Sequence, residues 1–446
     1  MTRFDRAFQK LADLTNYERK RPDVPYRFDL AGMEGLLERL GSPERGLGKI
    51  VQVGGSKGKG TVAALFAGLC HRSGATTGVY ASPHVRDLTE RILLRGTPVP
   101  RERLLPHVER VADVLAEGQT WFEAWTAVAV LVFAQDQPDF CIFEVGLGGR
   151  LDSTTVLPHD ACCLTRVELE HTQVLGDTIA EIAREKIGIL RSGKACVTGF
   201  QGMALDLLEA KALQLDVPLE ILGRDFGFEI LERSDQGFRL RLEFVESHGI
   251  EADVPLHAEV QVESLVLAMA LLRQVDPPRF AQILDLEFGR GLQESLPPAR
   301  FQVVGIDPPL VIDGAHTDQS LELLARDLEA AFPGRRFSLV LGMAAGKQYR
   351  AGLGRLASLV DRAWVAPITG KPSLSPRELM DFLLEQGVRT EQSPGIGEAV
   401  RSARQEQAGT MQGSEHPVAG RSGRPGLLVT GSLYAAGEAL GVLERE

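Results

Sequence analysis

A glycine-rich segment between an apolar run and a helical run constrains this chain more than any other feature. Residues 50–53 are a short apolar run, the sequence Gly55-Ser-Lys-Gly-Lys-Gly-Thr61 follows, and a helix-like apolar run begins at Val62. A strand, a glycine loop and a helix in this order aim backbone N–H groups and a helix N-terminus at a phosphate. We therefore predict a phosphate-binding loop here.

Within this loop, Lys59 and Thr61 carry the chemistry. Lys59 would reach the outer phosphates of a nucleotide, and the Thr61 hydroxyl could bind Mg²⁺. The match to the general P-loop pattern is imperfect, because Val53 takes the place of its first glycine and Gly60 the place of its serine or threonine. The alternative is a glycine-rich turn with a solvated lysine. The grouping of Gly55, Gly58, Lys59, Gly60 and Thr61 after a strand favours the phosphate loop.

Composition places limits on partners and compartment. The 446 residues suffice for two or three domains, and the formal net charge of -11 gives no support for a nucleic acid or an acidic membrane surface as a partner. An anionic substrate must therefore be held by local cations. The five cysteines lie in apolar runs without CxxC spacing, so we expect buried reduced thiols and a cytoplasmic protein. No signal peptide or membrane-spanning run is expected.

The order of elements predicts the fold class. Buried strands at 76–81, 140–145, 161–167 and 195–200 alternate with helical runs, which predicts an α/β protein with a parallel sheet. The texture changes after Arg224: residues 226–244 alternate as an antiparallel hairpin does, and a helix is expected at about 259–272.

The sequence Leu296-Pro-Pro-Ala-Arg300 is the best domain boundary, because prolines stiffen it and α/β alternation restarts beyond it. We therefore predict an N-terminal P-loop ATPase domain with a parallel sheet (1–296) and a smaller C-terminal Rossmann-like α/β domain (297–446). The run 405–426 is rich in Gly, Ser, Gln and Pro and is expected to be a mobile surface loop.

Further polar clusters follow predicted strands, where α/β enzymes place their sites. Ser82, Glu144 and His171 each follow one strand, and Asp313-Gly-Ala-His316 follows a strand of the second domain. A hydroxyl, a carboxylate and an imidazole near a phosphate loop make a plausible Mg²⁺ site, although imidazole is an unusual ligand for so hard an ion.

Each of these residues has an ordinary structural alternative. Ser82 could cap a turn, Glu144 could pair with Arg150, His171 could be structural, and Lys186 could be a solvated helix lysine. The run Gly146-Leu-Gly-Gly lacks the GxGxxG spacing of a dinucleotide site.

Eight motifs follow one another along the chain: Gly55-Ser-Lys-Gly-Lys-Gly-Thr61, Tyr80-Ala-Ser-Pro-His-Val85, Phe122-Glu-Ala-Trp-Thr126, Glu144-Val-Gly-Leu-Gly-Gly-Arg-Leu-Asp152, Glu170-His-Thr-Gln-Val-Leu-Gly-Asp-Thr-Ile179, Ala183-Arg-Glu-Lys-Ile-Gly188, Asp313-Gly-Ala-His316 and Thr430-Gly-Ser-Leu-Tyr434. Taken together, these motifs closely resemble the folylpolyglutamate synthase/dihydrofolate synthase family of the Mur ligase superfamily. The resemblance runs through nearly the whole chain.

The resemblance implies an ATP-dependent ligase of Mur ligase architecture, in which a substrate carboxylate is phosphorylated by ATP and L-glutamate then displaces phosphate. The implied small-molecule partners are ATP, L-glutamate and dihydropteroate or a folate, with Mg²⁺ as metal. Lys186 matches a lysine that is carbamylated in that family and then helps to hold a second metal. The protein is expected to be a monomer.

The site residues implied by the resemblance fall into four groups. They are Lys59, Lys186 and His316 for catalysis; Gly55, Gly58, Lys59, Gly60, Thr61, Gln261, Arg300 and Asp313 for ATP; Asp29, Leu30, Phe122, Glu123, Ala124, Leu151, Asp152 and Ser153 for the pterin–benzoate pocket; and Ser82, Glu144, His171 and Lys186 for metal.

This chain departs from the family pattern at several positions. Lys57 stands where Asn is usual, Thr317-Asp318 replaces Asn-Pro, Ser153-Thr-Thr155 replaces Ala-Thr-Asn, and Gln261 takes the place of an ATP-contacting Asn. Three rivals therefore stay open: a Mur-type ligase for another carboxylate, a P-loop kinase, and a binding protein without catalysis. Whether the substrate is dihydropteroate, a reduced folate or both is also open.

Overall fold

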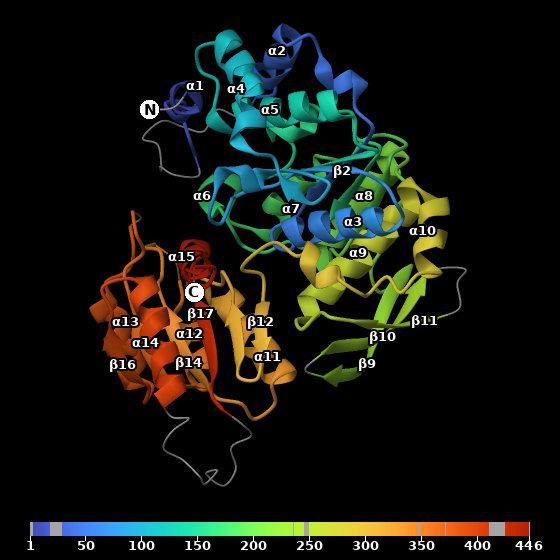
Figure 1. Ribbon diagram of the computed structural model, residues 1–446. Helices are drawn as coiled ribbons and strands as arrows, with labels where there is room; N and C mark the ends of the chain where they lie inside the picture. The colour runs from blue at the N-terminus through green and yellow to red at the C-terminus, as the bar shows by residue number, and fades with distance from the viewer. Residues whose placement is uncertain are drawn as a thin grey trace. The chain divides into compact units, whose positions relative to one another are not determined.

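The computed structural model describes residues 3–17, 29–234, 236–244, 249–346, 348–370, 372–409 and 424–445. The chain divides into two compact units (Figure 1). The first unit comprises Met1–Leu231, Arg239–Val254 and Val260–Ser295, and the second comprises Glu232–Phe238, Pro255–Glu259 and Leu296–Glu446. The two short segments that group with the second unit were not indicated by the sequence. The assignment of functional domains to 1–296 and 297–446 stays a prediction.

The first unit is built on an eight-stranded sheet of order β4-β3-β2-β5-β1-β6-β7-β8. The strands are β1 (Lys49–Gly54), β2 (Thr77–Tyr80), β3 (Ile92–Leu94), β4 (Thr97–Pro98), β5 (Phe140–Glu144), β6 (Ala161–Leu164), β7 (Ala195–Thr198) and β8 (Leu219–Ile221). The pairs β2–β3 and β3–β4 are antiparallel, and the other pairs of this sheet are parallel. The strand β1 lies between β5 and β6, with Val51 opposite Ile142 and Ala161. The predicted parallel α/β sheet is confirmed.

Helices cover this sheet and supply most of its core. They are α1 (Arg3–Ala12), α2 (Ala31–Arg39), α3 (Lys59–Arg72), α4 (Arg101–Val114), α5 (Trp121–Asp136), α6 (Thr172–Leu175), α7 (Ile179–Ile187), α8 (Gly202–Leu215), α9 (Glu259–Val275) and α10 (Pro277–Leu284), with 3-10 turns at Pro43–Gly46, Leu88–Arg91, Ser153–Val156 and Leu292–Ser295. Capping boxes start two of the helices, Thr120 with Glu123 at α5 and Thr178 with Glu181 at α7. The start of each of these two helices is therefore fixed by local sequence.

A small antiparallel sheet of order β11-β10-β9 follows in the chain. Its strands are β9 (Phe226–Ser234), β10 (Gly237–Phe244) and β11 (Ile250–Val254). Burial along β10 alternates, and its Phe244 stacks on Phe226 with ring centroids 6.3 Å apart. The hairpin predicted from the alternating pattern of 226–244 is therefore confirmed.

The second unit contains a six-stranded sheet of order β12-β13-β17-β14-β15-β16. Its elements are β12 (Gln302–Ile306), β13 (Pro309–Ile312), α11 (Asp318–Ala331), β14 (Phe337–Leu341), α12 (Arg350–Ala357), β15 (Val360–Val365), α13 (Pro376–Glu385), β16 (Arg389–Gln392), α14 (Ile396–Gly409), β17 (Gly426–Thr430) and α15 (Leu433–Leu443). Only β12 runs antiparallel, paired with β13. The expected C-terminal α/β architecture is confirmed.

The loop predicted in the second unit is wrong in its first residues. The loop predicted for 405–426 begins too early, because α14 continues to Gly409 and β17 already starts at Gly426. Glu406 pairs with Arg362 of β15, and Gln407 Nε2 donates to Pro425 O at 2.9 Å, so tertiary contacts hold the last turns of a helix whose composition there is typical of a loop. Residues 410–423 lie outside the described part of the chain.

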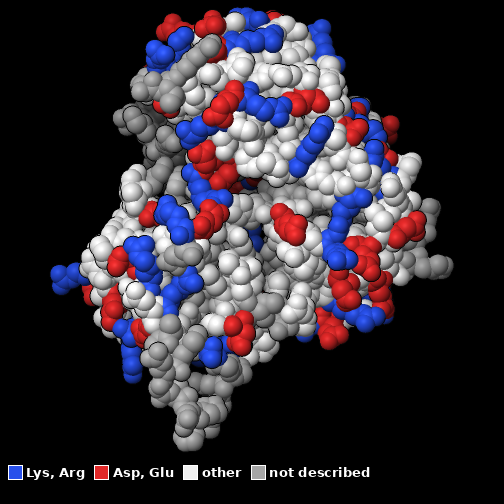
Figure 2. All heavy atoms as spheres, in the orientation of Figure 1, with Lys and Arg blue, Asp and Glu red and all other residues white. Residues whose placement is uncertain are grey.

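The surface and the thiols agree with the composition. All five cysteines are free and buried. Figure 2 shows lysine and arginine intermixed with aspartate and glutamate, without one continuous patch of either sign on the face in view. None of the helices in the described ranges is both long and apolar enough to cross a bilayer.

Candidate active site

The phosphate loop, residues 55–58, connects β1 to α3 and is fixed to the segment that follows β6. Gly55 has φ +133°, and a Cβ there would stand 2.0 Å from Thr165 Oγ1. The Ser56 N–H donates to Arg166 O at 2.6 Å, and Thr165 Oγ1 donates to Lys57 O at 2.6 Å. Only a glycine allows this close approach of two backbone segments. The loop is therefore a built structure rather than a free turn.

Lys59 lies in the first turn of α3 with its ammonium group folded over the loop. Its Nζ donates to Gly55 O at 3.0 Å and to Ser56 O at 3.3 Å. A phosphate carries far more negative charge than these carbonyl oxygens and would compete for the same hydrogens. The neighbouring Thr61 is buried, with its side chain in the same helical turn. Lys59 therefore stands where the sequence predicts a phosphate-binding cation.

Two of the predicted metal ligands, Ser82 and Glu144, lie in contact beside this turn. The Ser82 N–H donates to Glu144 Oε2 at 3.0 Å. A Cβ on Gly60 would stand 3.4 Å from the same oxygen, so the carboxylate lies over the start of α3. Glu144 is buried, and Arg150, its alternative partner, pairs with Glu185 at 2.8 Å instead. Hydroxyl and carboxylate oxygens at this place suit a hard divalent cation.

Lys186 is buried beneath the phosphate loop. Its side chain is 1% exposed, and its Nζ donates to Gly55 O at 3.0 Å and to Glu170 Oε1 at 3.1 Å. Burial, together with the charge of Lys59, lowers the pKa of Lys186 to about 8, although Glu170 opposes the change. The alternative reading of Lys186 as a solvated helix lysine is wrong.

His171 follows Glu170 directly and begins α6 with φ 47°. Its side chain is exposed and lines the large cavity described below. The order Glu170-His171 therefore brings the surroundings of Lys186 next to that cavity. Within the described ranges no three His, Cys, Asp or Glu side chains form a metal cluster.

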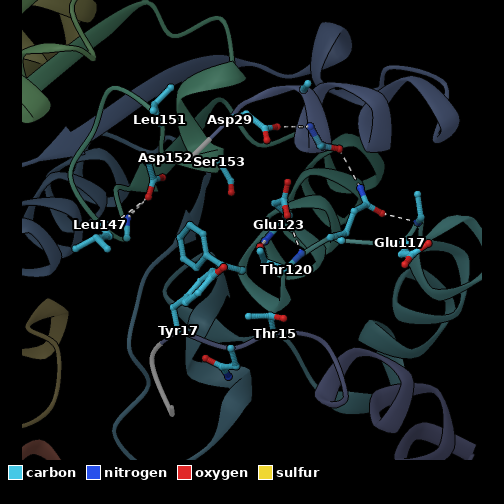
Figure 3. Close-up of a pocket in the computed structure, with 18 of the residues that line it drawn as sticks. Thr15, Tyr17, Asp29, Glu117, Thr120, Glu123, Leu147, Leu151, Asp152 and Ser153 are labelled. Atoms are coloured by element: carbon cyan, nitrogen blue, oxygen red, sulfur yellow. Dashed lines mark hydrogen bonds between the residues drawn. The ribbon is translucent and has the colours of Figure 1, made fainter. Parts of the chain in front are cut away.

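A cavity of about 510 Å³ opens in the first unit (Figure 3). Six of the residues assigned to the pterin–benzoate pocket line it: Asp29, Phe122, Glu123, Leu151, Asp152 and Ser153. Two others, Leu30 and Ala124, are not among the lining residues. Leu30 sits at the start of α2, and Ala124 is fully buried in α5. The size suits a drug-sized ligand.

Four carboxylate residues line this cavity, namely Asp29, Glu117, Glu123 and Asp152 (Figure 3). Glu123 Oε2 accepts the Thr120 N–H at 2.7 Å, while a Cβ on Gly32 would stand 2.5 Å from Oε1. Burial raises the pKa of Glu123, and the charge of Asp29 raises it further. Burial also raises the pKa of Asp152, against the hydrogen bonds that it accepts. A ligand with N–H donors could bind the Glu123 carboxylate, whereas Asp152 already accepts four hydrogen bonds from the protein.

Sequence reasoning missed several residues of the pocket wall. They are Thr15, Asn16, Tyr17, Arg39, Gln119, Thr120, Gly146 and Leu147. A signal existed for Thr120, since Thr120 and Glu123 have the spacing of a capping box. No local signal marked Thr15, Asn16 and Tyr17, because this segment lies beside the pocket through the bridge of Thr15 to Thr120.

The helix α9 carries Gln261 and passes close to the phosphate loop. Gln261 is 2% exposed in the first turns of this helix, and the Ser264 hydroxyl would lie 3.5 Å from a Cβ on Gly58. The pair Arg166–Glu263 joins the same helix to the segment after β6. The structure thus brings Gln261 to the neighbourhood of the loop, while its contact with a nucleotide stays a prediction.

The second unit gathers its three predicted residues at the end of β13. Asp313 accepts the N–H groups of Phe301 and Ala315, each at 2.7 Å, and Arg300 lies between two residues with positive φ, Ala299 and Phe301. Burial raises the pKa of Asp313. His316 Nδ1 lies 2.8 Å from Gly314 O. Asp313 therefore fixes the turn that presents Arg300.

Comparison with known proteins gives one family description and many relatives. Residues 299–412 match the family described as Mur ligase, glutamate ligase domain. The chain is 31% identical to a probable bifunctional folylpolyglutamate synthase/dihydropteroate synthase of Haloferax volcanii, over 91% of this chain but 47% of that protein. It is also 31% identical to the dihydrofolate synthase/folylpolyglutamate synthase of Bacillus subtilis, over 74% of this chain and 79% of that protein.

A solved structure extends the likeness to three dimensions. The bifunctional folylpolyglutamate synthase/dihydrofolate synthase of Yersinia pestis, complexed with AMPPNP and a manganese ion, has 26% sequence identity and a TM-score of 0.81. The match covers 100% of this chain and 98% of that chain. The present chain thus spans about half the length of the Haloferax relative, and nearly all of the Yersinia structure.

Proposed function

Because this chain belongs to the dihydrofolate synthase/folylpolyglutamate synthase family, we propose that it is an ATP-dependent ligase that joins L-glutamate to a folate-type carboxylate. The products are the amide, ADP and phosphate. The observation that carries the proposal is the continuity between two sites. Lys186 binds the phosphate loop at Gly55 and also Glu170, whose neighbour His171 lines the cavity.

This continuity supports phosphorylation of a carboxylate on a substrate held in the cavity. A carboxylate is a poor electrophile until it is phosphorylated, and phosphoryl transfer needs chiefly positioning and neutralisation of charge. Lys59 supplies a cation at the loop, and the N-terminus of α3 supplies backbone N–H groups. The amino group of L-glutamate then displaces phosphate from the acyl phosphate.

We propose that Mg²⁺ is the metal, that Ser82, Glu144 and His171 would hold it, and that a carbamylated Lys186 would help to hold a second ion. The contact between Ser82 and Glu144 over the start of α3 supports this set. A bound divalent cation would neutralise charge on the transferred phosphoryl group. We further propose that Gln261, Arg300 and Asp313 contact ATP, that His316 takes part in catalysis, and that the protein is a cytoplasmic monomer.

The test of this function is ADP release in the presence of a panel of carboxylates. We expect ADP to form only when ATP, L-glutamate and either dihydropteroate or a reduced folate are all present. Mass spectrometry should then show a product heavier by one glutamyl residue. ADP release without glutamate, with a phosphorylated stable acceptor, would instead identify a kinase. Activity with other carboxylates alone would identify a different Mur-type ligase.

Glu123 gives a specific prediction for the pocket. We propose that its carboxylate accepts N–H groups of the pterin ring, since it is buried and faces the cavity. Glu123→Gln should raise the KM for the pterin substrate by roughly 10-fold or more, because a hydrogen bond to a charged acceptor is lost. The KM for ATP should change little. Glu34→Gln on the exposed face of α2 is the matched control, and equal KM values in both variants would exclude Glu123 from recognition.

A further inference from the structure

A buried side chain outside the described site, Gln52, connects the strand of the phosphate loop to the turn that lines the cavity. Gln52 lies on β1, two positions before the end of the strand at Gly54, and is 1% exposed. Its Nε2 donates to Thr154 Oγ1 at 3.0 Å and to Thr155 Oγ1 at 2.9 Å. Both threonines follow Asp152, and both are buried.

Each of the two threonine hydroxyl groups accepts a hydrogen bond from Gln52 and donates its own hydrogen to a further acceptor. Thr154 Oγ1 donates to Asp152 Oδ1 at 2.6 Å, and Thr155 Oγ1 donates to Gly149 O at 2.7 Å. Because each hydroxyl has one hydrogen and that hydrogen is already used, each must accept from Gln52. The amide orientation of Gln52 follows from this network.

Asp152 in turn binds the backbone just after β5. Its Oδ2 accepts the N–H groups of Gly146 and Leu147, each at 3.0 Å. Gly146, Leu147, Asp152 and Ser153 line the cavity. The turn 146–152 is thus held at Gly146, Leu147 and Gly149 through bonds that converge on the single amide of Gln52.

We propose that Gln52 is a positioning residue for the substrate pocket: its amide sets the geometry of the turn 146–152 from the strand that carries the phosphate loop. This inference rests on the proposed function for the identity of the ligand. It predicts a selective effect, because the side chain of Gln52 donates to Thr154 and Thr155 beside the pocket turn, whereas the backbone of β1 connects Gln52 to the phosphate loop.

The variant Gln52→Met keeps the length and apolar packing of the side chain but removes both donated hydrogen bonds. Its dissociation constant for dihydropteroate, measured by calorimetry, should rise roughly 5- to 10-fold. Its dissociation constant for ADP with Mg²⁺ should stay within twofold of the wild-type value. A general loosening of β1 would instead weaken both ligands together, and that result would overturn the proposal.

A double-mutant cycle with Thr155→Val tests whether the effect passes along the network. Gln52→Met, Thr155→Val and the double variant should weaken dihydropteroate binding non-additively, whereas Thr155→Ser should restore most of the affinity. The matched control is Thr198→Val, since Thr198 is a buried threonine that donates to Leu164 O on β6 at 2.9 Å. It should cost stability without changing dihydropteroate affinity. Additive effects in the cycle would contradict the proposal.

Amide hydrogen exchange gives a readout that does not depend on the ligand. In Gln52→Met the amides of Gly146 and Leu147 should exchange faster than in the wild type, while those of β7 should not. Unchanged exchange would overturn the positioning role of Gln52. A wild-type protein that fails to bind dihydropteroate would instead refute the proposed function, and exchange would still decide the question for Gln52.

Discussion

Lys59→Ala should lower turnover by roughly 10²-fold or more while the protein stays folded. The Lys59 ammonium lies over the phosphate loop at 3.0 Å from Gly55 O, where it would neutralise charge developing on the transferred phosphoryl group. Turnover is measured as glutamate-dependent ADP release at saturating substrates, and circular dichroism checks the fold.

The control for Lys59 is Lys211→Ala, which removes a lysine of α8 whose Nζ donates to Gln214 Oε1 at 3.0 Å. This variant should keep wild-type turnover. Lys59→Ala within a few-fold of the wild type would remove Lys59 from the catalytic machinery. It would return the loop to the reading of a glycine-rich turn with a structural lysine.

Lys186→Ala should abolish most activity and regain part of it when a short carboxylate such as acetate is added. The carbamate proposed on Lys186 would supply two hard oxygen donors, and a free carboxylate can enter the space that alanine leaves. Lys186→Arg should stay inactive with acetate, because the guanidinium fills the same space and remains cationic. The measurement is ADP release across a range of acetate concentrations.

The pH dependence of carbamylation follows from the burial of Lys186. Only the neutral amine reacts with CO₂, and a pKa lowered to about 8 leaves roughly a tenth of the amine neutral at pH 7. The neutral fraction rises as the pH rises through about 8. At constant dissolved CO₂, a decarbamylated enzyme should therefore regain activity faster at high pH.

In the acetate experiment, a rescue of Lys186→Arg equal to that of Lys186→Ala would contradict the proposal that Lys186 is carbamylated.

The sequence predicted the fold because its local signals agree with its tertiary structure. The apolar runs of β1 and β5 are buried on both faces, as parallel strands require, and the hairpin of β9 and β10 alternates as an antiparallel pair does. The edge strand β12 was missed. It follows a proline-rich segment and is too short to show an apolar period, and it forms a hairpin with β13 in which Ile306 lies opposite Pro309.

The site was predicted only in part, for a similar reason. Lys59, Glu144 and Lys186 belong to motifs that can be recognised in the sequence, and the structure brings them to one edge of the sheet. Gln52 and Thr15 have no motif, because their roles come from contacts with residues about 100 positions further along the chain. Burial of Lys186 was also only partly predictable, since its helix has the amphipathic pattern of a surface helix.

The most direct test of the central claim is the transfer of oxygen from substrate to phosphate. Dihydropteroate labelled with ¹⁸O in its carboxylate is incubated with ATP, L-glutamate, Mg²⁺ and the enzyme, and the released phosphate is analysed by mass spectrometry. An acyl phosphate route predicts one ¹⁸O atom in each phosphate, because the carboxylate oxygen that attacks ATP leaves with the phosphoryl group. Unlabelled phosphate released in step with the amide product would contradict the account.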